Sequence, residues 1–223
     1  MKTPNISKNK KTPAILYIEA RSSKTKPEDY YIDPKFIKNL PKDIFLVYSI
    51  QFKQQAEQMK KALEAGNIRI RGFQQVLGCS ELKTPYAILL IGQGRFHALN
   101  LALQNERPVI IYSNGSSVIV GRKEIEEYRK KKQAALSRFF MEDKIGILVS
   151  TKPGQNRLEE AEALKKKLER KYPQKKFFIF ISNNINLHEM SNFDADLFIN
   201  TACPGLSYDS PRILNTDDIL PFL

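Results

Sequence analysis

The sequence lacks the patterns that identify membrane and secreted proteins. No apolar run among its 223 residues approaches the roughly 20 residues that a helix needs to cross a bilayer. The segment 1–12 is basic but has no apolar stretch of the kind found in secretory signals. We therefore expect a cytoplasmic protein without a membrane partner, with a disordered basic lead-in at residues 1–12.

Cysteine and histidine are also scarce, since only Cys79, Cys203, His97 and His188 occur. No Cys-x-x-Cys pair is present to build a mononuclear zinc site, and nothing resembles a Ser–His–Asp triad. Each cysteine lies in a turn beside glycine or proline and near an apolar stretch, a place where open α/β domains bind ligands. We interpret the two thiols as ligands at matched positions in two halves. The common alternative for a lone cysteine is apolar filler in a core.

The composition is otherwise that of a globular protein, with 42% hydrophobic and 27% charged residues. The net charge of +12 and a pI near 9.6 indicate an anionic partner. Lysine clusters such as 130–132 and 165–167 also fit solvated helix faces, which is the simpler interpretation. Aromatic residues do not alternate with these clusters as they do in proteins that stack single-stranded bases. We therefore predict no direct nucleic-acid contact.

The sequence contains an internal repeat. An offset of 101 positions aligns Ser49 with Ser150 and Leu63 with Leu164. Each half begins with a continuous apolar run, at 44–49 and at 145–150, and an amphipathic helix follows each run. A repeat of this length has the size of a domain, so it implies duplicated domains rather than a solenoid.

Alternating apolar runs and amphipathic helices predict an α/β protein whose parallel sheets are covered on both faces. We expect two homologous domains, each a small parallel sheet flanked by helices, joined by a long basic helix. The predicted boundaries are 13–120 for the first domain, with Cys79, 121–143 for the linker helix, and 144–223 for the second domain, with Cys203. Further strands are predicted at 14–18, 86–91 and 108–112 in the first domain and at 177–181 and 195–199 in the second.

Two strand-to-helix turns carry residues suited to ligand binding. In the first, residues 92–97, glycines let the backbone approach an anionic or zwitterionic ligand, and helix amides supply donors. The third glycine of a dinucleotide fingerprint is absent, and a plain tight turn is an equal alternative. The second turn, residues 150–155, has no Gly-Lys-Ser/Thr ending, which excludes a nucleotide P-loop. The alternative role of this second turn is a helix cap.

Four motifs, taken together, resemble a known family. They are Gln-Val-Leu-Gly-Cys at 75–79, Ile-Gly-Gln-Gly-Arg-Phe-His at 91–97, Val-Ser-Thr-Lys-Pro-Gly-Gln at 149–155 and Asn-Thr-Ala-Cys-Pro at 200–204. In order and spacing they resemble the archaeal diphthamide synthase catalytic subunit, 2-(3-amino-3-carboxypropyl)histidine synthase. The resemblance extends over nearly all of the chain from about Ala14 onward.

The resemblance implies a radical enzyme with a [4Fe–4S] cluster. In this family three homologous α/β domains each give one cysteine to the cluster, and the open iron engages the substrate S-adenosylmethionine. The 3-amino-3-carboxypropyl group is transferred to a histidine of translation elongation factor two, the first step of diphthamide biosynthesis. The resemblance makes Cys79 and Cys203 the second and third cluster ligands. It also implies an electron donor and a possible dimer.

The same resemblance and the repeat predict a cleft for S-adenosylmethionine between facing sheet edges. The predicted lining is Gly92, Gly94, Arg95, His97, Lys152 and Gln155, with Ser49, Gln51 and Asp209 at the rim. Arg95 is expected to hold the carboxylate of the ligand in a forked pair. The alternative for Arg95 is a surface salt bridge, and no catalytic residue is assigned.

The sequence departs from the family pattern in three respects. The family's first domain, with the first cysteine, is absent from these residues, Gly205 replaces an arginine, and lysines stand at 130–132 where an arginine-rich segment is usual. Our leading hypothesis is that another polypeptide supplies the N-terminal domain and the third cysteine. The alternatives are a non-catalytic binding or scaffold subunit of the same complex, and a truncated, inactive product.

Overall fold

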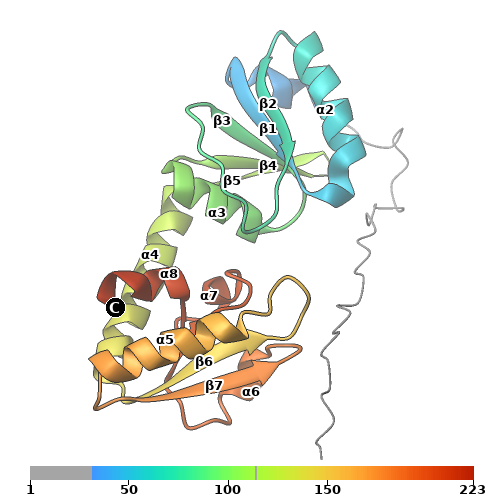
Figure 1. Ribbon diagram of the computed structural model, residues 1–223. Helices are drawn as coiled ribbons and strands as arrows, with labels where there is room; N and C mark the ends of the chain where they lie inside the picture. Colours follow the sequence, from blue (N-terminus) through green and yellow to red (C-terminus); the bar gives the residue numbers. More distant parts are fainter. Residues whose placement is uncertain (1–31, 114) are drawn as a thin grey trace, which may run out of the picture.

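The computed structural model describes residues 32–113 and 115–223. These residues form two β-sheets, and the long helix α4 (Arg122–Met141) runs from one sheet to the other, as Figure 1 shows. The predicted linker at 121–143 therefore contains a helix that begins at Arg122 and ends at Met141. The predicted lead-in at 1–12 and the predicted strand at 14–18 lie outside the described residues.

The first sheet has five strands in the order β2-β1-β3-β4-β5. Strands β1 to β4 pair in parallel, whereas β5 pairs antiparallel with β4. The strands are β1 (Asp43–Tyr48), β2 (Arg69–Gln75), β3 (Ala87–Ile91), β4 (Val109–Ser113) and β5 (Ser116–Val120). The helices of this part are α1 (Pro34–Lys38), a short 3-10 helix (Ile50–Phe52), α2 (Lys53–Ala65) and α3 (Arg95–Asn105).

Helices cover both faces of the first sheet. Successive residues of a strand point to opposite sides, so each inner strand contributes side chains to both layers. Ile44 and Leu46 of β1 pack with Met59 of α2 on one face. On the other face, Val47 of β1 packs in a cluster with Leu101 of α3. Burial on both faces explains why β1 and β3 are continuous apolar runs rather than alternating ones.

The second sheet has four parallel strands in the order β7-β6-β8-β9. They are β6 (Lys144–Ser150), β7 (Lys176–Ser182), β8 (Leu197–Asn200) and β9 (Ile213–Asn215). The helices are α5 (Leu158–Lys171), α6 (Leu187–Met190), α7 (Leu206–Asp209), α8 (Thr216–Ile219) and a 3-10 turn (Leu220–Phe222). Phe139 of α4 and Leu164 of α5 pack on Ile147 at one face, and Leu206 of α7 packs near Phe198 at the other.

The predicted α/β fold class is confirmed, with one difference in strand direction. The first sheet is mixed, because the antiparallel β5 closes its edge. The sequence does not predict β2, β5 or β9. Strand β2 lies at the edge of the sheet and carries polar residues such as Arg69, Arg71 and Gln75, so it shows no apolar run. Strand β9 has three residues, too few to show a period.

Strand topology corrects the prediction that the two cysteines occupy matched positions. In each sheet the first strand pairs on one side with the second strand and on the other with the third, so β2 corresponds to β7 and β3 to β8. Cys79 follows β2, an edge strand, whereas Cys203 follows β8, an inner strand. The two cysteines are therefore not repeat equivalents. They share only their place beyond the carboxyl end of a parallel strand.

None of the helices in the described ranges combines the length and the apolar character that a membrane span requires.

Candidate functional site

The two cysteine loops both contact one aromatic ring, that of Phe96 in the first turn of α3. A Cβ atom placed on Gly78, the residue before Cys79, would lie 1.8 Å from Cε1 of Phe96. A Cβ atom on Gly205 would lie 3.2 Å from Cζ of Phe96 and 3.4 Å from Sγ of Cys203. Both thiols are free, with Cys79 exposed and Cys203 half-buried. Phe96 thus lies between loops that are more than a hundred residues apart in the sequence.

The Cys203 loop is held by side-chain amides. The Asn200 amide donates to the Cys203 carbonyl at 2.8 Å and to Oδ1 of Asn215 at 2.8 Å. The backbone amide of Leu206 donates to the same Cys203 carbonyl at 3.1 Å. The Thr201 hydroxyl donates to the Leu148 carbonyl at 2.8 Å, which ties the start of the loop to β6. These bonds fix the backbone on both sides of Cys203.

Helix α3 holds the Cys79 loop. The carbonyl of Ser80 accepts hydrogen bonds from the side chains of Asn100, at 3.3 Å, and Gln104, at 2.9 Å. The Ser80 hydroxyl accepts from the Leu77 amide at 2.7 Å and closes the turn around Cys79. The same helix that presents Phe96 therefore also anchors this loop.

A row of aromatic rings continues from Phe96 to α4. The Phe96 ring meets Tyr208 of α7 edge-on, with centroids 4.9 Å apart, and Tyr208 stacks on Tyr128 of α4 at 4.4 Å. The hydroxyls of Tyr128 and Ser207 lie 3.3 Å apart. Burial raises the pKa of Tyr208, and the neighbouring Tyr128 adds to the shift. Tyr208 is therefore a neutral phenol at every physiological pH.

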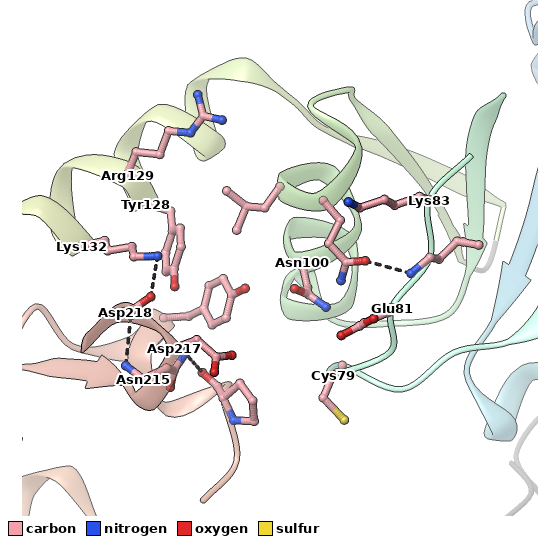
Figure 2. A pocket seen from close by; sticks show the side chains of 16 residues that line it. Cys79, Glu81, Lys83, Asn100, Tyr128, Arg129, Lys132, Asn215, Asp217 and Asp218 are labelled. Carbon is pink, nitrogen blue, oxygen red and sulfur yellow. Dashed lines mark hydrogen bonds and ion pairs between the residues drawn. The ribbon is translucent and has the colours of Figure 1, made fainter. Parts of the chain in front are cut away.

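A cavity of about 850 Å³ lies beside the Cys79 loop, between the two sheets and α4. Figure 2 shows Cys79, Glu81 and Asn100 on one side and Tyr128, Lys132 and Asp218 on the other. Both loops reach the cavity, through Gly78 and Cys79 and through Pro204. The complete lining is Gly78, Cys79, Glu81, Leu82, Lys83, Asn100, Leu103, Gln104, Tyr128, Arg129, Lys132, Pro204, Tyr208, Asn215, Asp217 and Asp218.

The far wall of this cavity is ordered by the buried carboxylate of Asp218. Asp218 forms an ion pair with Lys132 of α4 and accepts a hydrogen bond from the Asn215 amide at 3.0 Å. Because the ion pair joins α4 to α8, it fixes the second sheet on the helix that connects the two sheets. Cations and carboxylates both face the cavity, so its charge is mixed.

The residues predicted on the first strand-to-helix turn lie close together. A Cβ atom on Gly92 would lie 2.9 Å from Oγ of the buried Ser49, and Gly94 has the positive φ, 109°, that favours glycine. Burial lowers the pKa of His97, which packs edge-on beside Phe96 at 5.7 Å. Arg95 is exposed and donates to Glu124 at 2.8 Å, the surface pairing named above as its alternative role.

The other predicted residues lie further along the sheet edges. Gln51 is in the 3-10 helix before α2. The Lys152 ammonium donates to the Asn184 side chain at 3.1 Å, and the Gln155 amide donates to the Lys152 carbonyl at 3.0 Å. Asp209 ends α7. The eight predicted ligand-binding residues other than Asp209 do not line the cavity beside Cys79. Their common role in binding a ligand therefore stays a prediction.

The sequence does not predict the row of aromatic rings formed by Phe96, Tyr208 and Tyr128. Tyr128 is recognisable only as part of the packing face of the linker helix, and Phe96 only as part of a turn motif. The available signal was the glycine next to each cysteine loop, Gly78 and Gly205, because each leaves room for the Phe96 ring.

The match to a family model decides the relationship to known proteins. Residues 4–213 match the model described as “Putative diphthamide synthesis protein”. This chain belongs to the diphthamide synthesis family.

Two relatives from this family support the assignment. The chain is 29% identical over 188 residues to 2-(3-amino-3-carboxypropyl)histidine synthase of Pyrococcus horikoshii, covering 78% of this chain and 53% of that protein. It is 32% identical over 157 residues to the protein of the same name from Methanocaldococcus jannaschii, covering 68% and 44%. The chain therefore spans about half the length of these relatives.

A solved structure extends the comparison to the fold. The crystal structure of Dph2 from Pyrococcus horikoshii with a 4Fe-4S cluster is similar at a TM-score of 0.69 and 26% identity. The similarity covers 83% of this chain and 58% of that chain. A second crystal structure of the same protein matches equally well.

The donor set of this chain fits part of such a cluster. Iron–sulfur clusters are held by cysteine thiolates, and the only two thiols of the sequence are free, accessible and attached to loops that share a contact. No group of three histidine, cysteine or carboxylate side chains converges as a metal site within the described ranges. Two thiolates are thus what these residues offer.

Proposed function

We propose that Cys79 and Cys203 are ligands of a [4Fe–4S] cluster in an enzyme of diphthamide biosynthesis. The enzyme transfers the 3-amino-3-carboxypropyl group of S-adenosylmethionine to a histidine of translation elongation factor two. The observation that carries this proposal is the contact of both cysteine loops with Phe96, which holds the two thiol-bearing loops together. Membership of the diphthamide synthesis family and the cluster of the similar Dph2 structure support it.

The third thiolate of the proposed site comes from outside these 223 residues, since the sequence has no further cysteine. With three thiolates, one iron of the cube stays open for substrate, as the family resemblance implies. With only Cys79 and Cys203, two irons lack protein ligands, and the cluster is expected to be labile. The proposed partners are therefore a polypeptide segment with the third cysteine, an electron donor and elongation factor two.

When bound, the cluster supplies the electron that cleaves S-adenosylmethionine reductively. The chain's own residues bind and orient. Asn200 and helix α3 fix the backbones of the two cysteine loops. The turn residue Gly94, whose Cβ position has only the His97 ring within 4 Å, leaves the backbone open to the amino acid end of the ligand. Arg95 is proposed to turn from Glu124 to the ligand's carboxylate.

Anaerobic reconstitution tests the proposed ligands. We would supply the chain with ferrous iron, sulfide and mercaptoethanol, whose thiol occupies iron sites that lack a cysteine. The wild type should develop the broad visible absorption of thiolate-bound iron and retain iron and sulfide in equal amounts after desalting. Cys79→Ala and Cys203→Ala should each lose the band and the bound iron on desalting, because the added thiol is then removed and one cysteine is too few to keep a cluster on the chain. Ser137→Ala, an exposed position of α4 whose hydroxyl bonds only to the Gln133 carbonyl of the same helix, is the control and should keep the band.

Two results would contradict the proposal. A full-strength band in both cysteine variants would show that other groups hold the iron. Absence of a band in the wild type, with or without added thiol, would favour the alternative of a non-catalytic scaffold subunit.

A further inference from the structure

We infer that Phe96 is a positioning residue that sets the separation of the Cys79 and Cys203 loops. The purpose of this positioning rests on the proposed function, since a cluster needs its thiolates at a fixed separation. The positioning itself is a property of the folded chain without iron, and it can be measured without iron.

The Phe96 ring is in close contact on both of its sides. The Phe96 ring occupies the space that a side chain on Gly78 would fill, because Cε1 lies 1.8 Å from that Cβ position. On its other side the ring lies 3.2 Å from the Cβ position of Gly205, in the Cys203 loop. A rigid ring in contact with two glycines limits how near the loops can come. Its loss would leave a gap between them.

The Phe96 ring also joins parts of the chain that belong to different sheets. Phe96 is the second residue of α3, which packs on the first sheet, whereas Gly205 and Tyr208 follow β8 of the second sheet. The stacked partner of Tyr208 is Tyr128 of α4. The row of rings therefore braces the two sheets against α4, at the side where the cysteine loops lie.

Helix α4 alone does not fix the separation of the two cysteine loops. Its 20 residues make a helix about 30 Å long. The curvature common in long helices displaces the far end of such a helix by about 5 Å. That displacement is comparable with the size of the proposed cluster, so a second contact between the sheets is needed. Phe96 supplies this contact beside the thiols.

The role of Gly205 follows from the same geometry. A Cβ atom on Gly205 would lie 3.2 Å from Cζ of Phe96 and 3.4 Å from the Cys203 sulfur. The absence of a side chain at this position lets Phe96 approach the Cys203 loop. Loop separation and the glycine at 205 are thus parts of one arrangement.

Pulsed electron paramagnetic resonance tests the inference on the chain without iron. We would replace both native cysteines by serine and attach nitroxides at Glu81→Cys and Pro204→Cys, exposed positions within two residues of each native thiol. The distance distribution between the labels should be narrow. With Phe96→Leu the distribution should shift or broaden by about 5 Å, the displacement that ordinary helix curvature produces over the length of α4. Phe177→Leu, the same change in the second sheet's core but on the edge strand β7, should leave the distribution unchanged.

Tyr208→Leu is the second variant, for the case that Phe96→Leu lowers the folded fraction measured by circular dichroism. It removes the ring that presses on Phe96 and should broaden the distribution while α3 stays intact. An unchanged distribution in a folded Phe96→Leu or Tyr208→Leu protein would overturn the inference. The cysteine reconstitution described above can fail while this test succeeds, so the two proposals are separable.

Discussion

Gly78→Ala gives the sharpest test of the packing between Phe96 and the Cys79 loop. The new Cβ would lie 1.8 Å from Cε1 of Phe96, about 2 Å closer than the ordinary contact between carbon atoms. The ring has little room to move, because Tyr208 and Gly205 lie on its other sides. Overpacking of this kind costs about 1–3 kcal/mol.

A smaller gain opposes that cost. Gly78 is not among the described glycines with positive φ, so alanine fits its backbone conformation. Alanine also lowers the conformational entropy of the unfolded chain, which raises the free energy of unfolding by about 0.4–1 kcal/mol. We therefore expect a net loss of about 1–2 kcal/mol in the free energy of unfolding. In a chain of this size the melting temperature falls by about 2–4 °C per kcal/mol. Circular dichroism melting measures it.

The attribution to Phe96 is tested by a double-mutant cycle. In a Phe96→Leu background the loss from Gly78→Ala should shrink by at least about 0.5 kcal/mol, because the branched side chain is smaller and not rigid. Gly146→Ala is the matched control, since its Cβ would meet the Phe198 ring at 2.4 Å, away from the cysteine loops. Its loss should not depend on Phe96. If Gly78→Ala loses the same free energy in both backgrounds, the reasoning is refuted.

Three further predictions concern single side chains. Because burial lowers the pKa of His97 from its ordinary value of 6.5, the imidazole should titrate below pH 6.5 when followed by nuclear magnetic resonance. The folded state is favoured with the ring neutral, so its stability is full above pH about 6.5 and falls as the pH is lowered. A titration midpoint at or above 6.5 would contradict this. Lys175→Met should lower the free energy of unfolding by about 1–3 kcal/mol in denaturant titrations, because the buried Lys175 ammonium donates to two carbonyls at the end of α4. The control Lys176→Met, at an exposed position, should change the free energy of unfolding by less than about 0.5 kcal/mol. Arg95→Lys should weaken the binding of S-adenosylmethionine, measured by calorimetry, because lysine lacks the forked geometry of arginine. Glu124→Gln, which frees Arg95 from its ion pair, should not weaken binding. Equal affinity of the Arg95→Lys variant and the wild type would remove Arg95 from the site.

The sequence predicts those strands that are buried on both faces. The runs at 44–49, 86–91 and 145–150 are apolar except for the serines that end the first and the last, because helices cover each side of their sheets. Strand β2 escapes prediction because Arg69 and Arg71 pair with Asp43 across the sheet edge, and this pairing is visible only once the strands are adjacent. Tertiary pairing thus decides a segment whose local pattern is polar.

The candidate site divides in the same way. Cys79 and Cys203 stand out in the sequence because the chain has no other thiol. The contact that joins their loops does not, because Gly78, Phe96 and Gly205 come from three segments that only folding brings together. From the sequence alone, a glycine near a cysteine can have many roles. In the structure, Gly78 and Gly205 both leave room for the ring of Phe96.

The unequal positions of the two thiols limit what the internal repeat can say about the third ligand. Cys79 follows an edge strand and Cys203 an inner strand, so the duplication that relates the two sheets does not relate the two cysteines. The repeat therefore cannot place the remaining thiolate of the proposed cluster by analogy with either one. What Cys79 and Cys203 share is a loop beyond the carboxyl end of a parallel strand, held by contacts with Phe96. A candidate third cysteine should be judged by that placement and by its access to the Phe96 side of both loops, rather than by alignment with this chain's repeat.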